Sequence, residues 1–140
     1  MTNSQNLQQI MDKIWEIKIK GAALGWSGRQ TYEAYKDLLP PEVTLIDFPS
    51  QSLNCAGYAL GLNRSTSDPM YFLELGYRKV DLPEQADVYM MFKGDDWIHL
   101  GKVVGKGIAI SKWAWEEPIF KHPLSFHPGP WDNIQYFRKV

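Results

Sequence analysis

The chain has 140 residues, a formal net charge of −1 and a pI of about 6.3. This balance lacks the excess of Lys and Arg that is typical of nucleic-acid-binding proteins. With 44% hydrophobic and 14% aromatic residues, the composition is that of a globular protein, and the length predicts a single domain over residues 1–140.

The first third of the chain has helical spacing. Apolar residues recur at intervals of three and four over residues 7–20, which is typical of one buried helix face, and Gly21 and Gly25 are expected to break this helix. Ser27 and Gln30 have the spacing of a capping box, which predicts a second helix that runs until Pro40. Residues 1–47 therefore form an N-terminal helical part.

The second half alternates short extended segments with Gly-containing turns, which is typical of an antiparallel meander. Helices before an antiparallel sheet give an α+β fold. We expect strands over residues 43–46, 88–92, 97–104, 108–113 and 134–138, and short helices over 56–62 and from Asp68 to Gly76.

Cys55 is the one cysteine of the chain, and it lies where an extended segment is predicted to meet a helix start. The dipole of a helix start favours the thiolate form of a cysteine. His99 lies on the expected central strand, with Ile98 and Leu100 on the opposite face. If the Cys55 helix packs on the His99 face, thiol and imidazole form a nucleophile–base pair. The alternative is a small buried cysteine and a hydrogen-bonded structural histidine.

Three short segments, in this order, resemble motifs of the NlpC-like and CHAP-type cysteine peptidases and amidases. Residues 54–59 resemble their Asp-Cys-Ser-Gly nucleophile motif, 87–92 their Gly-Asp-Val strand and 97–101 their His-Val-Gly strand. This chain has Asn54 in place of the Asp and Ala86 in place of the strand Gly. It is also similar to uncharacterised bacterial papain-like domains that pair an Asn-Cys-x-x-Tyr-Ala-Leu-Gly segment with a later Ser-Lys pair.

The resemblance implies a papain-like fold in which residues 53–140 form the catalytic helix and sheet. It implies a cysteine hydrolase, acyl transferase or deamidase that acts on an amide bond of a peptide or protein, without a cofactor. Cys55 would attack the carbonyl carbon, and His99 would protonate the leaving amine. The third catalytic residue of these enzymes follows on the next strand, which corresponds to Ser111 here, with Lys112 and His122 as alternatives.

Further residues are candidates for binding roles. The backbone N–H of Cys55, with the side chain of Asn54 or Tyr58, would form the oxyanion hole. Trp113 either packs in the core or lines a substrate groove. His122 and His127 lack the spacing of zinc ligands, so we expect no metal. The rival interpretation is a catalytically inactive papain-like module with a binding or immunity-type role.

The sequence also bears on location. No stretch approaches the about 18 apolar residues that span a membrane. Residues 1–6 are polar and unlike a signal peptide, and a single cysteine forms no internal disulfide. We therefore expect a cytoplasmic protein with no membrane partner, while export without such a signal and the oligomeric state stay open.

Overall fold

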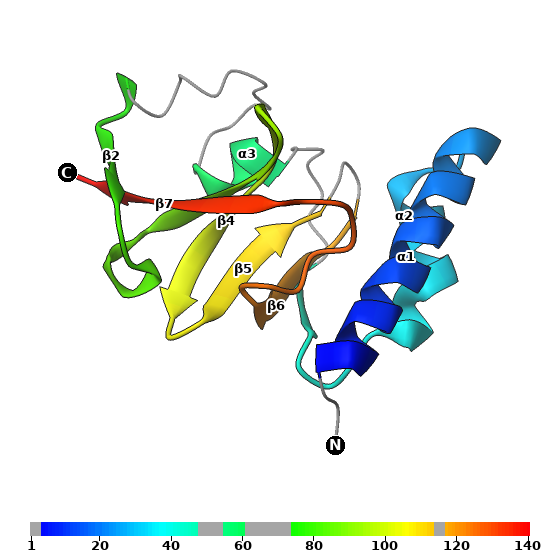
Figure 1. Ribbon diagram of the computed structural model, residues 1–140. Coiled ribbons are helices and arrows are strands. Elements are labelled where there is room, and N and C mark those ends of the chain that lie inside the picture. Colours follow the sequence, from blue (N-terminus) through cyan, green and yellow to red (C-terminus); the bar gives the residue numbers. More distant parts are fainter. Residues whose placement is uncertain (1–3, 48–54, 61–73, 114–116) are drawn as a thin grey trace.

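The computed structural model describes residues 4–47, 55–60, 74–113 and 117–140. It is an α+β fold in which two N-terminal helices precede an antiparallel sheet of seven strands (Figure 1). Within the described residues, no helix has the length and apolar character needed to cross a membrane. The expected α+β class is confirmed.

The first helix, α1, spans Ser4–Leu24 and is longer than predicted. Of the two glycines expected to break the helix, Gly21 lies inside it, and its lack of a side chain leaves room for neighbours: a Cβ there would come within 2.8 Å of the Trp26 ring and 2.9 Å of Thr31 Oγ1. The helix ends instead before Gly25, whose φ is +74°. The N–H of Trp26 then bonds to the carbonyl of Gly21 at 2.8 Å, as in a Schellman motif.

The second helix, α2, spans Gly28–Tyr35 and begins at the predicted capping box. Ser27 Oγ accepts from the N–H of Gln30 at 3.1 Å, and Gln30 Oε1 accepts from the N–H of Ser27 at 2.8 Å. The helix ends earlier than expected, and a 3-10 turn over Lys36–Leu38 carries the chain toward the first strand. α1 and α2 lie side by side, next to the end of the sheet that β1 and β6 form (Figure 1).

The strands follow the order β1-β6-β5-β4-β3-β7-β2, with all neighbours antiparallel. The meander β3 to β5 agrees with the prediction, whereas β6 and β2, which pairs with β7, were not expected. The start of the helix expected from Asp68 lies outside the described residues. The strands are β1 Thr44–Asp47, β2 Tyr77–Val80, β3 Val88–Lys93, β4 Asp96–Gly105, β5 Ile108–Lys112, β6 Ile119–Pro123 and β7 Asn133–Lys139.

The two faces of the sheet bury different partners. One face packs against α1, α2 and the β6–β7 loop, which bury the aromatic side chains Trp113, Phe120 and Phe126. The other face packs against the short helix α3, Cys55–Ala59, through two alanines. A β4 side chain on one face therefore points toward α1, α2 and the β6–β7 loop. A β4 side chain on the other face points toward α3.

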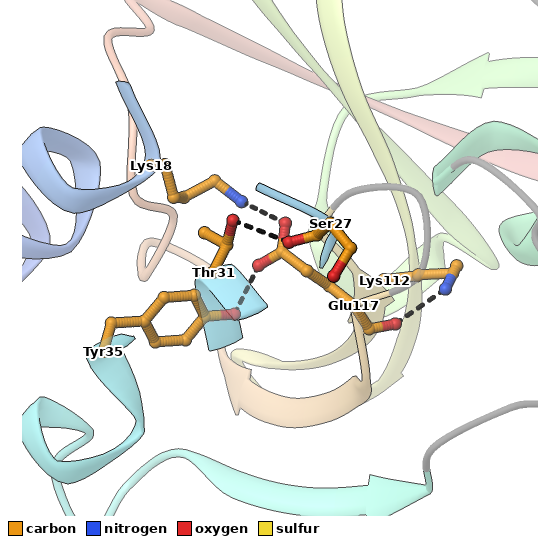
Figure 2. A network of polar contacts seen from close by, with 6 residues as sticks. All are labelled: Lys18, Ser27, Thr31, Tyr35, Lys112 and Glu117. Atoms are coloured by element: carbon orange, nitrogen blue, oxygen red, sulfur yellow. Dashed lines mark hydrogen bonds and ion pairs between the residues drawn. The ribbon is translucent and has the colours of Figure 1, made fainter. Parts of the chain in front are cut away.

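One buried carboxylate joins the helices to the sheet (Figure 2). Glu117 is 2% exposed, and its Oε2 lies 2.6 Å from Lys18 Nζ of α1. Its Oε1 accepts from the Tyr35 hydroxyl of α2 at 2.5 Å, and its carbonyl accepts from Lys112 Nζ of β5 at 2.6 Å. Burial and the Glu117 charge raise the pKa of Tyr35, so the phenol stays a donor. We call these four residues the Glu117 cluster.

Replacing Glu117 by Gln is expected to lower the free energy of unfolding by about 3 kcal/mol, because Lys18 loses its buried counter-charge. The matched control is Glu33→Gln, which removes the exposed Glu33–Lys36 pair and is expected to change stability by about 0.5 kcal/mol or less. Urea unfolding of both variants measures the difference. Equal small losses would show that the Glu117 cluster does not clamp the helices.

Candidate functional site

Cys55 is the first residue of α3, and its side chain is partly exposed. Its thiol lies against the backbone N–H of Leu100 on β4 and against the N–H groups of Ala56 and Cys55 itself. Burial raises the pKa of the Cys55 thiol, whereas these N–H groups and the Lys18 charge act to lower it. The thiol is therefore held beside the residue that follows His99, and it stays protonated at neutral pH.

His99 is fully buried on β4. It lies opposite Met91 of β3, and its Nε2 is 3.2 Å from the Tyr89 hydroxyl. Its Nδ1 is buried and has no hydrogen-bond partner among the described residues. The His127 ring stacks on it, with 4.3 Å between the ring centroids. One nitrogen of His99 is thus held by Tyr89, and the other is free to exchange a proton.

The side chains around His99 lie on other faces of the sheet than the strand pattern predicted. The α3 alanines pack with Leu100, not on the face of Met91 and His99. Ile98 was expected opposite His99, but it packs with the Tyr89 and Met91 cluster. The reason is a β-bulge: Met91 pairs with His99, whereas Phe92 pairs with Trp97. The expectation that the Cys55 helix packs on the His99 face is therefore wrong for the described part of α3, and the thiol meets β4 at the backbone N–H of Leu100.

Tyr89 connects the candidate residues. Its ring lies on Gly101, where a Cβ would come within 2.5 Å of a ring carbon. Its hydroxyl contacts His99 Nε2 and hydrogen-bonds with Ser111, and it is near enough to Cys55 for the two to interact electrostatically. Burial raises the pKa of Tyr89, so the hydroxyl keeps its proton. Thiol, imidazole and serine therefore belong to one cluster with Tyr89 at its centre.

Donor counting gives this chain of hydrogen bonds a direction. His122 Nδ1 lies 2.7 Å from the carbonyl of Pro123, which only accepts, so the proton of neutral His122 is on Nδ1. His122 Nε2 then accepts from Ser111 Oγ at 2.7 Å. Ser111 has one proton, so in its contact with Tyr89 it can only accept, and the tautomer of neutral His99 that fits this arrangement has its proton on Nε2. In that tautomer the lone pair is on Nδ1, the nitrogen without a hydrogen-bond partner among the described residues.

The remaining predicted residues lie elsewhere. Ser111 contacts His122 and Tyr89, and no hydrogen bond joins it to His99 in the described part of the chain. Lys112 belongs to the Glu117 cluster. Tyr58 lies under Lys102, with Nζ 4.6 Å from its ring centroid. Trp113 is 6% exposed and packs in the core, so it lines no open groove.

Asn54 falls outside the described residues, and with it the side-chain part of the expected oxyanion hole. Among the residues that are described, no group of three or more His, Cys, Asp or Glu side chains is placed to hold a metal ion. The sequence interpretation missed Tyr89 and His127. Strand alternation puts Tyr89 on the His99 face, but the close approach to Gly101 depends on register. His127 lies in a loop without a periodic pattern.

Comparison with known proteins adds no relative. No family model matches the chain, and no curated protein or solved structure matches it significantly. The site has to be interpreted from its own geometry.

All three histidines of the chain are buried and neutral at pH 7. Burial lowers the pKa of His122 to about 4. Burial, with the nearby charge of Lys18, lowers the pKa of His127 to about 3. Burial first, then the neighbouring histidines, lowers the pKa of His99 well below its usual range. In the folded protein at neutral pH, the resting form of each ring is therefore uncharged.

Acid is therefore expected to destabilise the protein from about pH 6.5 downward, because the unfolded chain there binds protons that the folded chain does not. For His122, whose pKa falls from 6.5 to about 4, the loss by pH 4 is about 3 kcal/mol. Urea midpoints measured between about pH 7.5 and about pH 4.5 should fall less steeply for His122→Gln than for the wild type. Parallel pH profiles would contradict a neutral buried His122.

Gly101→Ala is expected to lower the free energy of unfolding by about 1–3 kcal/mol, because the new methyl group collides with the Tyr89 ring. Gly105→Ala is the control on the same strand, since a Cβ at Gly105 meets nothing within 4 Å. Chemical denaturation of both variants tests the contact. A Gly101→Ala protein as stable as Gly105→Ala would mean that Tyr89 does not need the glycine.

Proposed function

We propose that this protein cleaves or transfers an amide bond through a cysteine, as a hydrolase, acyl transferase or deamidase of papain-like type. Cys55 is the nucleophile and His99 is the base. The observation that carries the proposal is the buried Nδ1 of His99, which has no hydrogen-bond partner among the described residues. The Cys55 thiol contacts the backbone N–H of Leu100, the residue that follows His99. A buried polar atom without a hydrogen-bond partner costs free energy, and groups of this kind cluster at functional sites.

The proposed reaction starts from a neutral thiol and a neutral imidazole, because burial raises the pKa of Cys55 and lowers the pKa of His99. As Sγ attacks the amide carbon, the thiol proton moves to His99 Nδ1 and the carbonyl oxygen becomes an oxyanion. The N–H groups at the start of α3 stabilise that charge. The low pKa of His99 makes its imidazolium a strong acid.

That imidazolium returns its proton to the leaving nitrogen while the C–N bond breaks, which leaves a thioester on Cys55. Water, or an acceptor amine, then attacks the thioester carbon and gives up its proton to His99. Release of the acyl group restores the thiol. Ammonia as leaving group corresponds to deamidation, and an amine corresponds to peptide or isopeptide cleavage.

Tyr89 is the proposed positioning residue for His99, in the place where the sequence suggested Ser111. Its hydroxyl accepts from His99 Nε2–H and so keeps the base on Nδ1. Ser111 and His122 extend the same chain of hydrogen bonds and direct the Tyr89 proton away from His99. The orienting group is thus neutral, which agrees with a neutral resting pair.

A catalytically inactive binding module, with an immunity-type role as one example, is the second candidate. The observation in its favour is that His99 is 0% exposed and covered by the His127 ring. A thiol whose pKa is raised by burial also fits an inert cysteine. The two candidates differ in one property, which is whether His99 activates Cys55.

Alkylation by iodoacetamide tests this, because the whole-protein mass reports only Cys55. At about pH 7, His99→Gln is expected to slow modification by about 100-fold, since a general base contributes about 10²–10⁴ in rate. Tyr89→Phe should slow it less, because the base remains but its tautomer is no longer held. His122→Gln, at the far end of the chain, should have the smallest effect.

Equal alkylation rates for folded wild-type and His99→Gln proteins would overturn the base assignment and favour the binding module. Activity is then measured on peptide, isopeptide and glutamine amides, with Cys55→Ala as the blank. Circular dichroism confirms that each variant is folded.

A further inference from the structure

A second candidate site lies on the helical side of the molecule, in a cleft of about 490 Å³ between α1 and the β6–β7 loop. The volume is in the range of small-molecule sites. The loop is held to the helix, because the N–H of His127 donates to Met11 Sδ at 3.2 Å. Gly129, at φ +145°, brings the loop backbone close to Trp15. A Cβ added at Gly129 would lie 3.3 Å from the Trp15 indole. The walls are therefore formed before any ligand binds.

Two indoles face this cleft from its two sides, Trp15 from α1 and Trp131 from the loop. Both are only partly buried, and the face of an indole ring attracts cations through its quadrupole. Met11 and Phe126 add apolar surface to the lining. A ligand that fits must have an apolar body of its own.

The polar lining has one sign of charge. Among the described residues that line the cleft, Asp12 is the one with a formal charge at neutral pH. Gln8 Nε2 donates to Asp12 Oδ1 at 2.9 Å, which orients the carboxylate and leaves Oδ2 for a second donor. The deep end is formed by His127, whose Nδ1 is buried without a hydrogen-bond partner in the described structure. Such a lining repels anions and favours a donor.

We propose that this cleft binds a small organic cation, an alkyl- or arylalkyl-ammonium, with its apolar body between Trp15 and Trp131 and its charge at Asp12. The proposal is independent of the thiol chemistry. His127 connects the two sites, because it lines the cleft and stacks on His99. A bound amine therefore lies one ring away from the proposed base.

Three probes that share one ring test the charge preference: 2-phenylethylamine, 2-phenylethanol and phenylacetate. In calorimetric titrations of the full chain, the amine is expected to bind about tenfold more tightly than the alcohol, with phenylacetate weakest. Asp12→Asn should lower the ratio of amine to alcohol affinity to the smaller preference that the two indoles give by themselves, and leave alcohol binding unchanged. Asp95→Asn, at an exposed turn residue, is the matched control and should leave all affinities unchanged.

Equal affinities for the three probes, no amine binding at about 10 mM, or an unchanged ratio in Asp12→Asn would each overturn the proposal. Trp15→Leu should weaken the amine and the alcohol alike, which places the apolar body in the cleft. Cys55→Ala should bind the amine as the wild type does, so failure of the thiol proposal does not affect the result. Circular dichroism checks the fold of each variant.

Discussion

The contact of the Tyr89 ring with the backbone of Gly101 is the constraint on which the proposed site depends. With no side chain at Gly101, the ring lies flat on β4, and its hydroxyl comes between His99 and Ser111. A hydroxyl donates one proton, so Tyr89 donates to only one of its two neighbours. Which neighbour receives the proton depends on the last acceptor in the series of hydrogen bonds. That last acceptor is the carbonyl of Pro123.

In the described part of the chain, two networks of buried polar groups lie on the helical side of the sheet. The Glu117 cluster joins α1, α2 and β5 through charge, whereas the chain from His99 to Pro123 is neutral throughout. Lys18 belongs to the first network and acts on the second. Its ammonium lowers the pKa values of Cys55, His99 and His127, though less than burial changes them.

The N-terminal helices are therefore part of the candidate site as well as its support. α1 provides Lys18 near the thiol, and one face further along the same helix lines the cleft with Asp12 and Trp15. Loop residue His127 lies between the two places, stacked on His99 and bound through its backbone to Met11. The His127 imidazole therefore contacts both the cleft and the proposed base, and it is neutral because it is buried.

The sequence by itself determined those features that depend on near neighbours. The capping box at Ser27, the apolar face of α1 and the hairpin turns of the meander are local patterns, and they formed where they were expected. The order of Cys55 and His99, and their placement on a helix start and a central strand, were also predicted correctly.

Only the tertiary structure decided what these residues face. The packing of Trp26 and Thr31 on Gly21 inside α1 was not visible in the helical spacing, and the bulge at Ile98 follows from how β3 and β4 pair. That the partner of His99 is Tyr89, and not Ser111 as the sequence suggested, also depends on tertiary packing. Periodicity tells which residues share a face, but the register between strands and the space above a glycine arise only when distant segments pack together.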